Sequence, residues 1–164
     1  MSKRAVNLLR KMAGDFEVAN AKLSVSKQPI TNITATATLT ATDSGRLAVV
    51  NDLASSATLS LPSAAAGLVF EFVYVGNAAD AQNLVIDTGS DTNYFVGGVV
   101  QHDTDAGGDD TAVWHPNGSS NSVATFVTPN SGTRIRCICQ DGTLWLLEGT
   151  LISATDTGVT WADQ

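Results

Sequence analysis

Basic residues are scarce in this chain, and its middle has none. The 164 residues carry 9 Lys and Arg against 16 Asp and Glu, a formal net charge of −7. No Lys or Arg lies between Leu47 and Thr133. An acidic surface repels phosphate backbones, so we do not expect nucleic acid as a partner.

The chain also has no long apolar run. A membrane-spanning helix needs about 18 or more consecutive apolar residues, and none is present, so we expect no membrane association. The basic N-terminus does not lead into an unbroken apolar segment, because Asn7, Arg10 and Lys11 interrupt it, and this argues against a signal peptide. We therefore expect synthesis in a cytoplasm, with Cys137 and Cys139 reduced.

Recognisable catalytic motifs are missing as well. The sequence has no G-x-S-x-G nucleophile elbow and no glycine-rich phosphate loop with its Lys. Glu71 and Glu148 would be the carboxylate pair for glycoside hydrolysis. Each sits inside an apolar strand-like pattern, however, where a single outward-facing carboxylate is the simpler explanation. We expect a protein that is not an enzyme and that needs no cofactor.

One acidic segment has part of a calcium-binding pattern. The stretch HDTDAGGDD places carboxylates on a glycine-rich loop, and such oxygens are typical calcium ligands. Asp103, Asp105 and Gly108 match the first, third and sixth positions of an EF-hand loop, but Trp114 stands at the twelfth, where a bidentate Glu is required. Calcium between Asp103 and Asp110 stays open beside the simpler interpretation, a solvated acidic loop.

A zinc site is the second metal hypothesis. Cys137 and Cys139 would combine with His102 and His115 into a set of two Cys and two His ligands. On a strand, two residues that lie two positions apart point to the same face, whereas zinc knuckles place a C-x2-C pair on a turn. Buried free thiols that act as small apolar side chains are the simpler interpretation, so we expect no metal.

The chain does contain many short strand-like segments between turn residues. Such segments, spaced roughly 8–12 residues apart, are typical of an antiparallel β-sandwich or a jelly-roll-like barrel, and we expect one all-β domain over residues 28–164. A linker that leads into a first strand is expected over 28–42. The other expected strands are 47–50, 57–61, 68–75, 83–87, 94–100, 111–114, 122–128, 134–140, 143–152 and 158–161.

Two of these segments carry sharper expectations. Residues 68–75, LVFEFVYV, are largely apolar on both faces, which predicts a central strand buried on both sides. The pair Asp141-Gly142 separates two strand-like runs. That composition is typical of a type I′ hairpin turn, in which both central residues need a positive φ.

The positive charge gathers in residues 1–27, which we expect to form a separate N-terminal arm. Its basic residues are Lys3, Arg4, Arg10, Lys11, Lys22 and Lys27, against Asp15 and Glu17. Residues 2–13 predict a short amphipathic helix, because Val6, Leu9 and Met12 recur every three positions. An isolated helix this short is only weakly populated, so it needs a surface to bind, either its own domain or another chain.

Three motifs carry a resemblance to a known class of proteins. They are DSGRLAVV, ATLSLPSAAAGLVFEF and the late DGTLWLLEGT, and together they span about Thr40 to Thr150. This pattern resembles the small β-rich virion structural proteins of tailed bacteriophages, of the head decoration, head fibre or tail-fibre-associated type. The motifs are packing motifs and identify no site.

The resemblance implies a function. Proteins of this class are non-enzymatic, often oligomeric, and bind the outer surface of an icosahedral capsid, which would make the major capsid protein the partner and a trimer the favoured oligomer. The virion would then be the location, after synthesis in the host cytoplasm. The residues expected to bind the capsid are those of the arm: Arg4, Val6, Leu9, Arg10, Lys11 and Met12.

Aromatic residues suggest an alternative, a fibre adhesin or a glycan-binding module that recognises a host surface. The candidates for stacking on sugars are Trp114, Trp145, Trp161, Tyr74 and Tyr94. Aromatics at strand spacing more often belong to a core or an interface, but Trp114 adjoins the polar turn HPNG. A sugar site would require Trp114 or Trp161 to be exposed beside carboxylates or amides.

Overall fold

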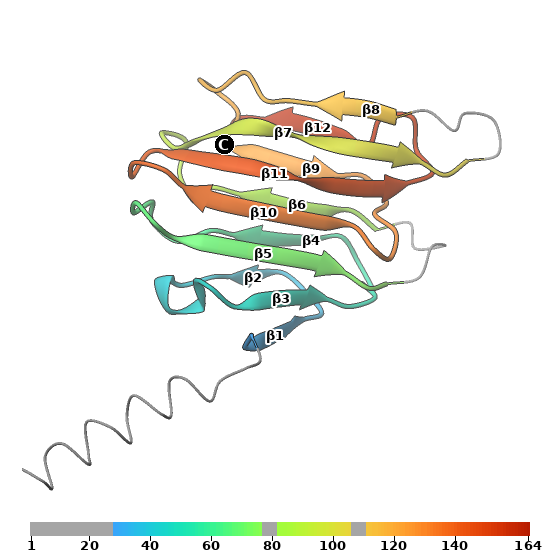
Figure 1. Ribbon diagram of the computed structural model, residues 1–164, viewed down its shortest axis with the longest axis horizontal. Helices are drawn as coiled ribbons and strands as arrows, with labels where there is room; N and C mark the ends of the chain where they lie inside the picture. The colour runs from blue at the N-terminus through green and yellow to red at the C-terminus, as the bar shows by residue number, and fades with distance from the viewer. Residues whose placement is uncertain (1–27, 77–81, 106–110) are drawn as a thin grey trace, which may run out of the picture.

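The computed structural model describes residues 28–76, 82–105 and 111–164 (Figure 1). The predicted arm, its helix and its six candidate binding residues lie outside these ranges, as do the last five residues of the acidic segment HDTDAGGDD. The described ranges contain no helix with the length and apolar character that a membrane crossing requires.

The described chain forms two stacked β-sheets (Figure 1). In sheet order, the seven strands of the larger sheet are β1 (Ile30–Ile33), β3 (Leu47–Val50), β5 (Val69–Tyr74), β10 (Arg134–Cys139), β11 (Leu144–Ser153), β7 (Tyr94–Asp103) and β8 (Thr111–Trp114). The five strands of the smaller sheet are β12 (Val159–Ala162), β9 (Val123–Phe126), β6 (Leu84–Asp87), β4 (Ala57–Ser60) and β2 (Ala37–Thr38). One turn of 3-10 helix, η1 (Ala41–Asp43), precedes β3.

The all-β prediction is confirmed, but the antiparallel prediction is wrong. Strands β1 to β6 alternate between the two sheets, so β1, β3 and β5 run parallel in the larger sheet and β2, β4 and β6 run parallel in the smaller one. Each connection crosses to the opposite sheet instead of making a hairpin, and parallel neighbours require such crossovers. Both sheets are therefore mixed, and neither closes into the barrel that was the other expectation.

The second half of the chain pairs mainly by antiparallel neighbours. The β10–β11 hairpin lies between β5 and β7 in the larger sheet, antiparallel to β5 and with β11 parallel to β7 (Figure 1). The two hairpin strands approach closely at Gly149, where an added Cβ would clash with the backbone carbonyl of Arg134. Glycine is therefore required at this point of the sheet.

The core fills the space between the sheets. The largest fully buried side chains of the larger sheet include Trp145, Tyr74, Phe72 and Phe95, and those of the smaller sheet include Phe126, Leu59, Leu84 and Ile86. The rings of Phe70 and Trp145 pack at a tilt, with centroids 5.9 Å apart. Each fully buried side chain of this size contributes about 1.5–3 kcal/mol to folding.

The two sharper expectations about strands are only partly right. Strand β5 is central, between β3 and β10, but its outward residues Val69, Glu71 and Val73 are half-buried, so only one of its faces joins the core. In the β10–β11 hairpin only Gly142 has a positive φ, 93°, and the turn is not type I′. The Asp141 carboxylate instead accepts hydrogen bonds from the backbone N–H groups of Thr143 and Leu144, both at 2.9 Å.

Candidate functional site

The outer face of the seven-stranded sheet is the most distinctive surface of the described chain. Its residues alternate with the core residues along each strand and align across the strands in register. We call this surface the large face. Its apolar members are Ile30, Leu47, Val49, Val69, Val73, Tyr94, Val96, Val100, Val113, Ile138, Leu144, Leu146 and Ile152.

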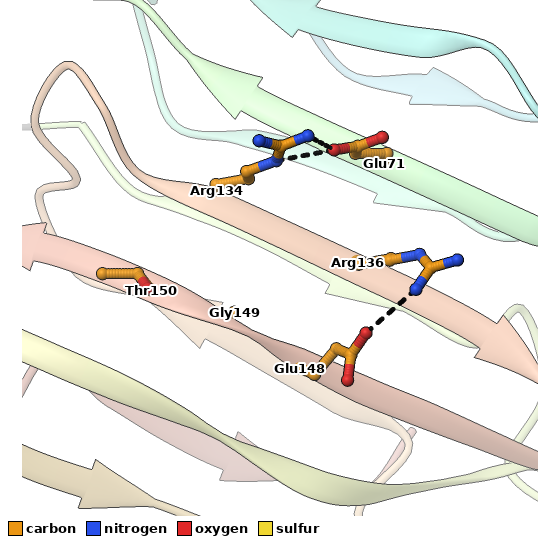
Figure 2. Close-up of a pocket in the computed structure, with 6 residues that line it drawn as sticks. All are labelled: Glu71, Arg134, Arg136, Glu148, Gly149 and Thr150. Atoms are coloured by element: carbon orange, nitrogen blue, oxygen red, sulfur yellow. Dashed lines mark hydrogen bonds and ion pairs between the residues drawn. The ribbon is translucent and has the colours of Figure 1, made fainter.

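Two ion pairs lie at the centre of the large face (Figure 2). Arg134 on β10 donates from both Nε and a terminal nitrogen to one carboxylate oxygen of Glu71 on β5, with Nε 2.6 Å from Oε1. On the other side of β10, Arg136 donates to Glu148 on β11 across 3.2 Å. The Glu71 side chain is only 15% exposed and the Glu148 side chain 48%, so the two pairs differ in their access to water.

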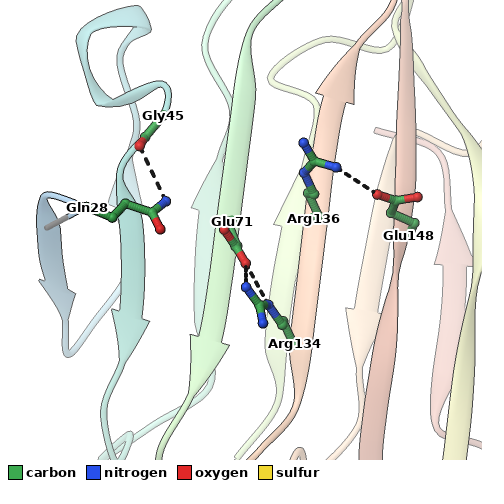
Figure 3. Close-up of polar contacts among 6 residues, drawn as sticks. All are labelled: Gln28, Gly45, Glu71, Arg134, Arg136 and Glu148. Carbon is green, nitrogen blue, oxygen red and sulfur yellow. Dashed lines mark hydrogen bonds and ion pairs between the residues drawn. The ribbon is translucent and has the colours of Figure 1, made fainter. Parts of the chain in front are cut away.

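The ion pairs border a shallow depression of about 300 Å³, lined by Glu71, Arg134, Arg136, Glu148, Gly149 and Thr150 (Figure 2). Figure 3 shows that β10 supplies both arginines, while the two glutamates come from the strands on either side of it. The carboxylates that sequence reasoning considered as a glycosidase pair therefore each have a guanidinium partner. The depression therefore presents cationic hydrogen-bond donors from the arginines and anionic acceptors from the glutamates on the open surface of the sheet.

The outer face of the five-stranded sheet, here the small face, has a different composition. Its outward residues are Thr38, Thr58, Ser60, Val85, Asp87, Val123, Thr125, Thr160 and Ala162. Hydroxyl groups dominate this surface, and the Ser60 hydroxyl donates to Asp87 across 2.9 Å. A polar outer face is the usual outcome for a sheet that meets water on one side.

The predicted thiols are buried. Cys137 and Cys139 point into the core from β10 and are free, as expected for small apolar side chains. Burial raises the pKa of Cys137 far above its ordinary value, which keeps the thiol protonated and unreactive. His102 and His115 are exposed, and within the described ranges no three His, Cys, Asp or Glu side chains gather where they could hold a metal.

The acidic segment is described only at its start. There the Asp103 carboxylate accepts a hydrogen bond from the backbone N–H of Asp105 across 3.0 Å, which is a local turn contact. The two interpretations of the whole segment, a calcium site and a solvated acidic loop, both stay untested.

The tryptophans pack on the core. Trp114 donates from Nε1 to the side-chain oxygen of buried Gln101 at 2.6 Å, and the Trp161 ring packs against Phe95 with centroids 6.3 Å apart. Trp145 is fully buried. Trp114 and Trp161 are both partly buried, and a glycan site at either stays a prediction.

Sequence reasoning missed the large face because it assigned β5 two buried sides. A usable signal was present in the segment RIRCIC, where Arg134 and Arg136 alternate with core residues and so must point outward together. Glu71 and Glu148 interrupt their apolar runs in the same way, and in the structure they flank the arginines.

Comparison with known proteins adds no family to this description. No protein-family model matches the sequence, and no curated protein matches it.

Proposed function

We propose that this protein is a non-enzymatic structural protein that acts by surface contact, as a component of a phage virion on the outer capsid surface. The observation that carries the proposal is the large face, an open sheet surface of aliphatic side chains around two ion pairs. Contiguous apolar surface of this kind marks sites of contact with other proteins. The resemblance of the sequence motifs to those of phage virion proteins is the reason for proposing a phage capsid as the assembly.

The arm of residues 1–27 is the proposed attachment element to the major capsid protein. Val6, Leu9 and Met12 would pack on the shell, and Arg4, Arg10 and Lys11 would pair with acidic groups there. The sandwich would serve as a rigid body that the arm holds in place. Deleting residues 1–27 should abolish attachment and leave the β domain folded, whereas loss of folding would assign the arm to the core.

Quantitative mass spectrometry of purified particles tests the proposal. A ratio of this chain to the major capsid protein near one, or near a simple fraction, supports a decoration protein at regular lattice positions. A ratio like that of the portal or tail proteins would move the function to a fibre or adhesin. Absence from the particle would overturn the virion function.

A further inference from the structure

The large face has exposed apolar side chains at both of its edges. Ile30 on the edge strand β1 is 55% exposed, and Val113 on the opposite edge strand β8 is 65% exposed. Between them the outward aliphatic residues of β3, β5, β10, β11 and β7 are half-buried by their neighbours alone. Apolar side chains therefore lie on every strand of the large face, and the two ion pairs, Asn32, Thr150, His102 and Thr111 lie among them.

Charge separates the large face from the rest of the described surface. Its four charged side chains are two arginines and two glutamates, which neutralise each other in pairs. The other described acidic residues are all aspartates and lie at strand ends, in loops or in the smaller sheet: Asp43, Asp52, Asp87, Asp91, Asp103, Asp105, Asp141, Asp156 and Asp163. Only one further described cation, Arg46, accompanies them.

This distribution favours a partner with the same charge as the chain. Two acidic molecules repel each other along most approaches, but two neutral faces meet without that cost. The outer side of the smaller sheet offers hydroxyl groups and Asp87 instead, so it is the side that suits water.

The size of the large face is sufficient for a stable contact. Strands lie about 4.8 Å apart and rise about 3.3 Å per residue, so seven strands span about 29 Å and the central strands, of six to ten residues, about 20–33 Å. The face therefore offers roughly 600–900 Å² per copy, and a standard interface buries about 800 Å² per partner.

We propose that the large face is the interface through which copies of this chain associate, so that the occupant of each large face is a second copy. The small faces then point away from the assembly, toward water. Preformed ion pairs suit such an interface, because each buried charge already has its partner before the copies meet. This inference rests on the proposed function in so far as the protein acts by surface contact, and it identifies a second copy of the chain as the molecule that contacts the large face.

Matched substitutions on the two faces test the inference. Val69→Lys on β5, two residues from Glu71, and Val100→Lys on β7, opposite Thr150, each add to the large face an ammonium group in excess of the two matched ion pairs. Val85→Lys on β6 makes the same change at a half-buried position of the small face. Sedimentation equilibrium of the full chain over a wide concentration range gives the dissociation constant of self-association for each variant.

The wild type and Val85→Lys are expected to form the same oligomer. Each large-face variant is expected to dissociate with a constant about tenfold higher or more, because association would bury its charge without a partner. A wild-type chain that stays monomeric, or large-face variants that keep the wild-type constant, would overturn the inference. Should a Lys variant fail to unfold cooperatively, the double variant Val69→Thr, Val100→Thr replaces it, since Thr keeps the branched shape and matches the small face.

The sedimentation experiment tests the inference, and the mass spectrometry of particles tests the virion function, so either proposal can be overturned without the other. A monomeric chain that is abundant in particles removes the inference and keeps the virion function, and the large-face variants would then be tested for attachment to the shell. An oligomer that depends on the large face but is absent from particles keeps the inference and removes the virion function.

Discussion

The large and small faces use the same backbone alternation and differ in what the outward positions carry. Along β5, β10 and β11 the outward residues are aliphatic or belong to an ion pair, apart from Thr150. Along β4, β6 and β9 three of the six outward residues carry hydroxyl groups and one is an aspartate. Both sheets share one core, so folding requires the inward residues of each and leaves the outward residues free to differ.

On the proposed association of copies, that difference places the contact on one side of the sandwich. Valine and threonine have the same shape and both favour strands, so a valine-rich outer face gives the monomer little that threonine would not. Its advantage appears when the face is covered, because the covered apolar area then contributes about 25 cal/mol per Å². Substitutions that separate stability from association therefore test the comparison directly.

The largest effect on stability is expected from Gly149→Ala, beneath the large face. The new Cβ would clash with the backbone of Arg134, so β10 and β11 must move apart, at a cost of about 2–3 kcal/mol in the free energy of unfolding. Gly67→Ala is the control: its φ of 90° is strained for alanine but nothing lies within 4 Å, so about 1 kcal/mol is expected. Urea denaturation measures the free energy of unfolding of both variants. Equal losses for the two would mean that the close approach of β10 and β11 at Gly149 does not set the geometry of the large face.

The two ion pairs should differ from each other. Glu71 is largely buried and accepts two hydrogen bonds from Arg134, so Glu71→Gln is expected to cost about 1 kcal/mol. Glu148 and Arg136 are about half exposed, so Glu148→Gln should cost about 0.5 kcal/mol or less, and added salt should reduce that cost. Urea denaturation of both variants at low and high salt measures the difference. A larger loss for Glu148→Gln would contradict the burial of Glu71 in the sheet.

Local patterns predicted the positions of the strands well. Strand β8 occupies the predicted 111–114, and β10 and β11 begin and end within a residue of their predicted bounds. Alternation is a property of a few consecutive residues, so it can be recognised in the sequence before the fold is known. Alternation placed Cys137 and Cys139 on one face, and their burial, expected from the apolar character of free Cys, is confirmed.

Which strands pair with each other could not be predicted from local patterns. Strand β3 pairs with β1 and β5 in the larger sheet, while β4, which lies between β3 and β5 along the chain, belongs to the opposite sheet. No local turn signal predicts that crossing. The large face depends on the same long-range order, because β10 lies beside β5 and β11 beside β7 only through insertion of the late hairpin between them. Glu71 and Arg134 are 63 residues apart, so the first ion pair could not be expected from spacing.

A smaller effect is expected in acid, at the hairpin loop that ends the large face. Hydrogen bonds from the backbone N–H groups of Leu144 and Thr143 and from the Thr143 hydroxyl hold the pKa of Asp141 below its usual value of 3.8. A carboxylate with a lowered folded-state pKa stabilises the fold above its unfolded pKa, and the contribution is lost as pH falls through the folded value. Asp141→Ala should therefore lower Tm at pH 6 and flatten its decline below about pH 4. Asp156→Ala, in another exposed loop, is the control. A decline as steep as that of the wild type would show that the loop contacts do not depend on the charge.

The smallest effect on stability is expected on the small face. Thr58 and Thr125 flank Val85 across β4, β6 and β9, so the double variant Thr58→Val, Thr125→Val creates an apolar row there. Valine fits these strand positions, and the free energy of unfolding should change by about 0.5 kcal/mol or less per substitution. The association constant should stay that of the wild type, because three valines form a narrow strip beside hydroxyl groups and Asp87, without the width of the large face. New oligomers in sedimentation equilibrium would mean that a short apolar row suffices for association, and the breadth and neutrality of the large face would then lose their explanatory role.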